Sequence, residues 1–276
     1  MDRIRLIASD MDATLLDEQS QLPADFEETI HALAELGIRF APASGRPLYT
    51  LEAMFPTLQD ELVFIGDNGG AIRWKGQNLF TSEMSPEGWR ALNRLTREQG
   101  DIAVLCGLES AYVERPFAVH DAVLRHFYTK IEYVDRLEDV AAPADKFTIY
   151  LPQHNAQQAY DTVYASQRSI YSVAVAGECW VDIMNPGVHK GAALQTLGQL
   201  WGLPSESMMA FGDTYNDAEM LRTAKYGFLM ENGSVPLCQK VPFLAPSHRE
   251  AGVMQVLHRV LAQNGCVCPE DFIPAH

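Results

Sequence analysis

Residues 10–16 read Asp-Met-Asp-Ala-Thr-Leu-Leu and directly follow the mostly apolar run Arg5–Ser9, RLIAS. A short apolar run of this kind predicts a buried strand. In open α/β sheets ligands bind beyond the carboxyl ends of the strands, so Asp10 and Asp12 stand where a site is expected. Two carboxylates this close repel each other unless a cation binds or one of them takes a proton. The pattern therefore indicates a cation or proton-transfer site.

This segment also has other interpretations. An Asp-Thr cluster can form a turn or a helix cap. A calcium loop of the EF-hand type is excluded, because the sixth position is Leu15 where Gly is needed and the twelfth is Gln21 where Glu is needed. A solvated acidic surface fits poorly with the apolar neighbours Leu15 and Leu16. The motif alone does not decide between a site and a turn.

Strands and helices alternate on both sides of the inserted middle of the chain. Apolar periodicity predicts, before residue 82, helix Pro23–Leu36, strand Ile38–Ala43, helix Leu48–Phe55 and strand Leu62–Ile65. After Pro186 the predicted elements are helix Lys190–Trp201, strand Ser207–Phe211, a helix starting near Asn216, strand Tyr226–Met230 and helix Ala251–Leu261. Such alternation predicts parallel pairing, and therefore an α/β core with a Rossmann-like parallel sheet.

Residues 82–185 follow a different pattern. The predicted elements here are helices Pro86–Gln99, Ala118–Phe127 and Ala156–Ala165, strands Ile102–Cys106, Ala111–Glu114 and Phe147–Leu151, and a hairpin of Ile170–Ala176 with Cys179–Met184, turned at Gly177. Neighbouring strands without helices between them favour an antiparallel sheet. We therefore expect a core formed by residues 1–81 and 186–276, interrupted by an inserted α+β domain at residues 82–185.

Two further segments carry groups suited to anions. Strand Ile38–Ala43 is followed by Ser44-Gly45-Arg46-Pro47, whose hydroxyl and backbone N–H groups, just before a helix, form an anion cradle. A simple turn leading into the helix is the alternative. Lys190 stands at a predicted helix start, where the helix dipole disfavours a cation unless an anion lies nearby. Lone lysines are, however, usually just solvated.

The strand Ser207–Phe211 ends in Gly212-Asp213-Thr214-Tyr215-Asn216-Asp217. Asp213 lies just past the strand, and Asp217 would lie in the first turn of the next helix, where a carboxylate is favoured. Helix capping by Thr214 and Asn216 is the alternative, and it accounts for the Asn better than for the Gly-Asp pair.

Parallel strands would bring these strand ends to one edge of the sheet. The groups gathered there would be carboxylates, a hydroxyl and an amine. Oxygen ligands around a hard cation indicate Mg²⁺ rather than zinc, because no set of His and Cys ligands is available.

The four segments resemble, in order, the four motifs of the haloacid dehalogenase-like superfamily. DMDATLL resembles its nucleophile motif, SGRP its serine motif, Lys190 its lysine motif and GDTYND its acidic motif. The insertion resembles the large C2-type cap of the Cof-type phosphatases, and the segment Asp67–Ala71 resembles the one those enzymes carry before the cap. The resemblance covers nearly the whole chain.

The resemblance implies a role for each matching residue. Asp10 would attack phosphorus and form an aspartyl phosphate, and Asp12 would protonate the leaving oxygen and then activate water. Ser44 and Lys190 would hold the phosphoryl oxygens. The implied metal positions are Asp10, Asp12 through its backbone carbonyl, Asp213 and, in support, Asp217. The implied phosphate-binding positions are Asp10, Met11, Asp12, Ser44, Gly45, Lys190 and Asn216, the last contacting either the phosphoryl group or Lys190.

Two positions need separate comment. The family usually has Gly where this chain has Ala13, and an alanine disfavours a turn that needs positive φ. We expect the change to be tolerated, because all proposed reactive side chains are present. Arg46 would reach the substrate or pair with a carboxylate such as Asp67, and we favour a structural or supporting role.

The composition limits the possible partners. The 276 residues have a net charge of -15 without a basic cluster, which opposes nucleic-acid binding. No apolar run approaches the ~18 residues of a membrane span, and charges interrupt the N-terminal apolar run, so we expect a cytoplasmic protein without a membrane partner. The five cysteines are scattered, and Cys266-Val-Cys268 has no partner ligands at zinc-finger spacing.

We therefore expect a Mg²⁺-dependent phosphatase acting on small phosphorylated metabolites, such as sugar phosphates or phosphorylated cofactors, as a monomer or homodimer. One alternative is a phosphomutase or phosphotransferase on the same core, which the lack of an obvious basic cluster in the insertion opposes. The other is a catalytically weak binding or regulatory protein, which the complete motifs oppose.

Overall fold

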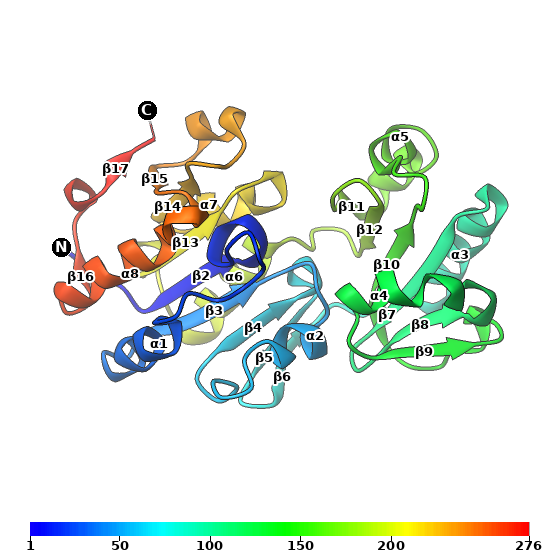
Figure 1. Ribbon diagram of the computed structural model, residues 1–276, viewed down its shortest axis with the longest axis horizontal. Coiled ribbons are helices and arrows are strands. Elements are labelled where there is room, and N and C mark those ends of the chain that lie inside the picture. Colours follow the sequence, from blue (N-terminus) through cyan, green and yellow to red (C-terminus); the bar gives the residue numbers. More distant parts are fainter. Residues whose placement is uncertain (276) are drawn as a thin grey trace.

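The computed structural model describes residues 1–275 and contains two large sheets with separate hydrophobic cores (Figure 1). The first has nine strands in the order β17-β15-β14-β13-β2-β3-β4-β5-β6, and the second has six in the order β11-β12-β10-β7-β8-β9. Strands β1 (Asp2–Arg3) and β16 (Cys266–Val267) form a small separate ribbon. In the part of the chain described, no helix is long and apolar enough to cross a membrane.

The centre of the first sheet is parallel, as the strand–helix alternation predicts. Its parallel strands are β2 (Leu6–Asp10), β3 (Arg39–Ala43), β4 (Val63–Gly66), β13 (Met208–Gly212), β14 (Tyr226–Met230) and β15 (Phe243–Ala245). In the register, Asp10 pairs with Ala43 and Ser9 with Phe211, so the carboxyl ends of β2, β3 and β13 lie side by side. The three motifs predicted at strand ends are therefore brought to one edge.

The outer strands of this sheet depart from the prediction of a purely parallel sheet. Strands β5 (Ala71–Trp74) and β6 (Gln77–Thr81) form an antiparallel hairpin on β4, and β17 (Ile273–Pro274) pairs antiparallel with β15. The hairpin turns at Lys75 and Gly76, both with positive φ. Sequence periodicity assigned no strand to residues 71–81.

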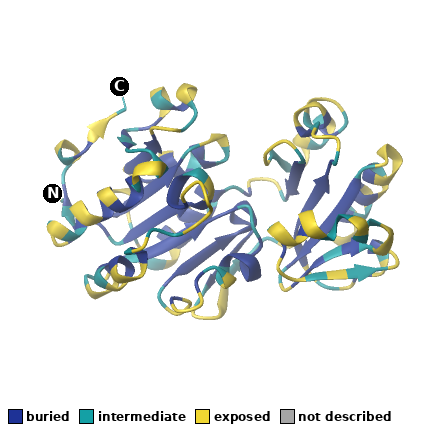
Figure 2. Ribbon diagram, viewed as in Figure 1, coloured by how far each residue is buried: buried dark blue, intermediate teal, exposed yellow. Residues whose placement is uncertain are grey.

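Helices cover both faces of the core sheet. Helices α1 (Phe26–Glu35) and α8 (Gly252–Ala262) contact each other on one face, and α6 (Lys190–Trp201) and α7 (Ala218–Thr223) on the other. Along β2, Ile7 belongs to the first core, whereas Leu6 and Ala8 belong to the second, which is the two-residue period of a strand. Figure 2 shows the strands buried and the outer helix faces exposed.

The second sheet is built from the inserted residues. Its strands are β7 (Ile102–Gly107), β8 (Ala111–Glu114), β9 (Ile131–Val134), β10 (Ala144–Tyr150), β11 (Ser172–Val175) and β12 (Trp180–Met184). All pairs are antiparallel except β8 with β9, which lie parallel. The predicted hairpin is confirmed, and Gly177 at its turn has φ of 73°.

The helices of the insertion are close to those predicted. Helix α3 (Pro86–Gln99) has the predicted bounds, because Ser85 caps its first turn and Gly100 ends it with positive φ. Helices α4 (Asp121–Phe127) and α5 (Ala156–Asp161) are shorter than predicted.

We propose the divisions after residues 81 and 185 as domain boundaries, since within residues 1–275 no strand pairing joins the two large sheets. Figure 1 shows the two sheets side by side, with α2 (Leu48–Ala53) of the core lying towards the insertion.

Candidate active site

The acidic motif forms a tight turn at the end of β2. Within it, Ala13 adopts φ of 58° and ψ of 14°, the left-handed region that favours glycine, and its carbonyl accepts a hydrogen bond of 2.8 Å from Asn232 Nδ2. The turn therefore needs positive φ, and alanine supplies it at a cost of about 1 kcal/mol. The loop keeps its shape because Met11 and Leu15 on either side are buried in the core.

A buried lysine lies between two carboxylates at the centre of the site. The Nζ of Lys190 donates to Asp10 Oδ1 and, at 2.7 Å, to Asp217 Oδ1. Lys190 and Asp217 are fully buried, and Asp10 is 8% exposed. These two anions offset the unfavourable dipole at the start of α6, which resolves the choice between a solvated lysine and one that needs an anion.

Asp217 is held on both of its oxygens. While Oδ1 accepts from Lys190, Oδ2 accepts from the backbone N–H groups of Asp213 and Thr214, at 3.1 and 3.2 Å. Thr214 and Asp217 form a capping box, so the helix-cap interpretation holds for Thr214 alongside the ion pair. A side chain at Gly212 would collide with Asp217, which explains the glycine there.

The carboxylates lie at about the spacing that a single hard cation needs. Asp10, Asp213 and Asp217 each offer an oxygen, and these oxygens all lie within 4.8 Å of one another. Two oxygens bound on opposite sides of one Mg²⁺ ion are about 4.2 Å apart, given ligand distances of about 2.1 Å. Because both oxygens of Asp217 are already engaged, Asp10 and Asp213 are the more available ligands and Asp217 supports them.

The electrostatics of this cluster also favour an added cation. Burial, reinforced by Asp217, raises the pKa of Asp10 to about 8 and the pKa of Asp213 to about 7. Burial alone would lower the pKa of Lys190, but Asp10 and Asp217 outweigh it and raise it. Three carboxylates thus share one amine. A divalent cation bound here would lower the pKa values of Asp10 and Asp213 again.

The serine motif lies beside this cluster, at the end of β3. Ser44 is 3% exposed, and its Oγ accepts a hydrogen bond of 3.1 Å from the backbone N–H of Arg46. Arg46 Nη2 donates to both oxygens of Asp12, at 2.9 and 3.1 Å. The suggested pairing of Arg46 with Asp67 is wrong, since Asp67 pairs with Lys146 at 3.1 Å.

Asp12 is consequently separate from the other carboxylates. Its side chain is 56% exposed and directed at Arg46, and it does not join the Asp10, Asp213 and Asp217 group. Only its backbone carbonyl is left as a possible metal ligand. The Asp12 carboxylate is therefore at the exposed side of the site.

The remaining predicted phosphate-binding positions differ in which of their groups are free to bind a ligand. Met11 is fully buried in the core, so only its backbone is available to bind a phosphate. The buried Oδ1 of Asn216 has no hydrogen-bond partner, and no bond joins Asn216 to Lys190 in residues 1–275. Gly45 accepts a hydrogen bond at its carbonyl from Lys146 of the insertion.

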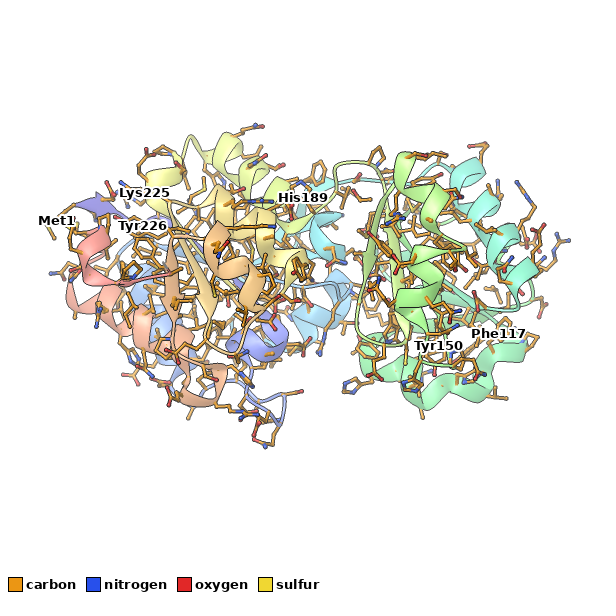
Figure 3. The ribbon with its side chains drawn as sticks, turned by 90° about the horizontal axis from the view of Figure 1, so that it is seen from above. Met1, Phe117, Tyr150, His189, Lys225 and Tyr226 are labelled. Carbon is orange, nitrogen blue, oxygen red and sulfur yellow. The ribbon has the colours of Figure 1, made fainter. Side chains whose placement is uncertain are left out.

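Figure 3 shows on which side of the core the carboxyl ends of the parallel strands lie. His189, the cap of α6, lies on the side of the core that faces the insertion, and Tyr226, at the start of β14, lies at the far end. The carboxyl ends of the strands therefore point towards the insertion, and the site is between the two sheets.

The sequence matches the family described as haloacid dehalogenase-like hydrolase over residues 7–257. The chain belongs to this family. It is 32% identical to a 5-amino-6-(5-phospho-D-ribitylamino)uracil phosphatase of Escherichia coli, over 94% of this chain and 96% of that protein. It is 31% identical to an HMP-PP phosphatase of Cronobacter sakazakii, over 87% and 89% of the two chains.

A solved structure agrees over most of the chain. A protein of Streptococcus mutans superimposes with a TM-score of 0.85 at 29% identity, covering 94% of this chain and 99% of the other. The α/β core with an inserted α+β cap is thus the fold of this family member, and the sequence resemblance is confirmed. As a Cof-type member of the family, the chain is an enzyme of the phosphatase type.

Sequence reasoning missed Lys146 and Asp182, two residues beside the site. Lys146, Asp67 and Asp182 form a buried ion cluster next to Gly45. Lys146 and Asp182 lie within strands of the insertion, where no motif sets them apart, and only the packing of the insertion on the core brings them to Gly45.

Proposed function

We propose that this enzyme is a Mg²⁺-dependent phosphatase that hydrolyses small phosphorylated metabolites through a covalent intermediate on Asp10. The observation that carries this proposal is the buried Lys190 bonded to Asp10 and Asp217, with Asp213 within reach of the same cation. It combines a nucleophile, a fixed positive charge and an oxygen-ligand set for a hard metal in one place.

In the first step, a carboxylate oxygen of Asp10 forms a bond to phosphorus while the bond from phosphorus to the leaving oxygen breaks. Asp12 donates a proton to that leaving oxygen. The Asp12 carboxylate must therefore be released from Arg46, which donates to both of its oxygens in this structure. After the proton has been transferred, Arg46 can again donate to both oxygens of the Asp12 carboxylate.

In the second step, Asp12 takes a proton from water as the water oxygen bonds to phosphorus and the bond to Asp10 breaks. Inorganic phosphate leaves, and the Asp10 carboxylate is restored. Lys190, the Ser44 hydroxyl and the backbone N–H groups near Met11 and Gly45 would hold the phosphoryl oxygens in both steps. Bound Mg²⁺ would supply positive charge that offsets the repulsion between Asp10 and the phosphoryl oxygens.

The relatives suggest which substrates to examine first. One is named for a phosphorylated ribitylaminouracil and another for HMP-PP. We propose phosphorylated cofactor precursors of this kind, together with sugar phosphates, as the substrate class. A cytoplasmic location and a monomeric or dimeric state stay predictions.

The test is phosphate release by the wild-type enzyme and by Asp10→Asn, with Mg²⁺ and with EDTA. The probes are p-nitrophenyl phosphate and 5-amino-6-(5-phospho-D-ribitylamino)uracil. We expect activity only with Mg²⁺ and a loss of at least about a thousandfold in the variant, since the nucleophile is removed. Equal turnover by Asp10→Asn would refute the covalent mechanism.

A further inference from the structure

Two lysines of the described chain are completely enclosed, and only one belongs to the catalytic cluster. Lys190 pairs with Asp10, whereas Lys146, on β10 of the insertion, is 1% exposed and plays no part in the mechanism above. Burying an ammonium group is costly unless it is paired and hydrogen-bonded. Its position therefore calls for an explanation.

Lys146 joins the insertion to the core. Its Nζ donates to the carbonyl oxygen of Gly45 and lies 3.1 Å from Asp67 Oδ1, both in the core. Its third partner, Asp182 Oδ2 at 3.6 Å, belongs to the insertion. A movement of the insertion away from the core would break the first two contacts and leave the third in place.

The surrounding charges keep Lys146 ionised. Burial alone would lower the pKa of Lys146, but Asp182 and Asp67 outweigh burial and raise it well above its usual range. The nearby carboxyl of Asp145 is fully buried, and burial raises its pKa well above the usual range, which favours its neutral form. Asp182 is also bound by Asn68 Nδ2 at 3.0 Å and by Thr148 Oγ1 at 2.7 Å.

The bond to Gly45 acts on the phosphate-binding segment through one peptide plane. The carbonyl of Gly45 and the N–H of Arg46 belong to the same planar peptide unit, so fixing one fixes the other. That N–H donates to Ser44 Oγ at 3.1 Å. The Lys146 ammonium group therefore orients the peptide that in turn holds the Ser44 hydroxyl.

We propose that Lys146 is a positioning residue that couples closure of the insertion to the orientation of the phosphate-binding segment Ser44–Arg46. With the insertion closed, Lys146 holds the 45–46 peptide, and Ser44 is set to receive a phosphoryl oxygen. With the insertion moved away, Lys146 stays with Asp182, and the segment loses this restraint. This inference rests on the proposed function, because it concerns how that site binds phosphate.

A matched pair of variants separates positioning from closure in general. Lys146→Met removes the ammonium group but keeps the length of the side chain. Glu109→Gln weakens another ion pair between insertion and core, Arg73 Nη2 to Glu109 at 2.7 Å, which does not touch the phosphate-binding segment. For each variant, kcat and KM with p-nitrophenyl phosphate and the inhibition constant of inorganic phosphate are measured.

For Lys146→Met we expect KM and the phosphate inhibition constant to rise together by about tenfold, with kcat changed by less than about threefold. Glu109→Gln should leave all three within about twofold. A merely structural role for Lys146 would reduce the amount of folded enzyme and leave KM and the inhibition constant unchanged. An equal rise in Glu109→Gln would assign the effect to closure alone and overturn the proposal.

A second variant covers the case in which Lys146→Met does not fold. In the double variant Lys146→Met with Asp67→Asn, neither buried partner is left charged and alone, while Asp182 keeps Asn68 and Thr148. We expect this protein to fold and to show the same rise in KM and inhibition constant. Wild-type values would overturn the inference. The proposed function fails separately, if Asp10→Asn is as active as wild type.

Discussion

Replacing Lys190 by methionine tests the electrostatic arrangement of the site. Lys190 is fully buried and bonded to Asp10 and Asp217, the latter at 2.7 Å. Removing one partner of a buried ion pair costs about 3–5 kcal/mol, because the other charges are left without compensation. At about 2–4 °C per kcal/mol, the melting temperature should fall by roughly 6–20 °C.

The chain offers a control with the same geometry and a different environment. Lys225 Nζ lies 2.7 Å from Asp2 Oδ2, but the two side chains are 40% and 25% exposed. Exposed pairs contribute about 0–1 kcal/mol, so Lys225→Met should change the free energy of unfolding by no more than that. The assay is urea unfolding of both variants in EDTA at pH 7, compared with the wild type.

The loss of unfolding free energy in Lys190→Met should depend on pH in a definite direction. Lys190 lowers the pKa of Asp10, so its removal raises that pKa further above the value in the unfolded chain. A carboxyl with a raised pKa in the folded state loses stability as the pH rises towards that value. The deficit of Lys190→Met should therefore stay nearly constant from pH 5 to pH 7 and grow above about pH 8, where Asp10 ionises in the folded wild type but not yet in the variant. If Lys190→Met lost no more unfolding free energy than Lys225→Met at every pH, the proposed ion pairing of Lys190 with Asp10 and Asp217 would be refuted.

Three other changes have expected outcomes. Ala13→Gly should increase the free energy of unfolding by about 1 kcal/mol, because glycine adopts φ of 58° without strain; a decrease in urea unfolding would contradict this. The rise in melting temperature on adding Mg²⁺ should be larger at pH 8.5 than at pH 6, because the ion must displace protons from Asp10 and Asp213, whose pKa values are raised to about 8 and 7. Asp213→Asn should remove most of that rise, and a pH-independent rise would argue against these ligands. Asp12→Asn should lower kcat by about a hundredfold or more while the free energy of unfolding changes by less than about 1 kcal/mol, since its side chain is 56% exposed; unchanged turnover would exclude Asp12 as the proton donor.

The core and the ends of its strands were predictable for a local reason. Short, mostly apolar runs ending in Asp10 and Gly212 leave few alternatives to parallel strands covered by helices. Because parallel strands meet at one edge, their polar ends had to come together. Helix α3 likewise has the bounds predicted from the sequence, and in the structure Ser85 and Gly100 cap its two ends.

The hairpin β5–β6 was not predictable in the same way. Its second strand is only partly buried, and Gln77 and Asn78 are polar residues at the edge of the sheet, so the two-residue period is weak. Its place on β4 is decided by pairing with an existing strand rather than by its own pattern.

The ion-pair partners of charged residues could not be predicted from the sequence either. From the sequence, Arg46 was expected to reach the substrate or to pair with a carboxylate such as Asp67. In the structure it forms an ion pair with Asp12, and Asp67 forms one with Lys146. Such choices depend on how the insertion packs on the core. The positive φ of Ala13 was foreseen only as a condition, because a single alanine does not show which turn it occupies.

The chemistry on Asp10 is tested most directly by rapid acid quenching of the enzyme during turnover of p-nitrophenyl phosphate with Mg²⁺, followed by mass spectrometry of its peptides. We predict one added phosphoryl group on the peptide that contains Asp10, absent without Mg²⁺ and absent in Asp10→Asn. Covalent phosphate on another residue, or turnover with no phosphorylated peptide in an Asp12→Asn variant that traps the intermediate, would contradict the account.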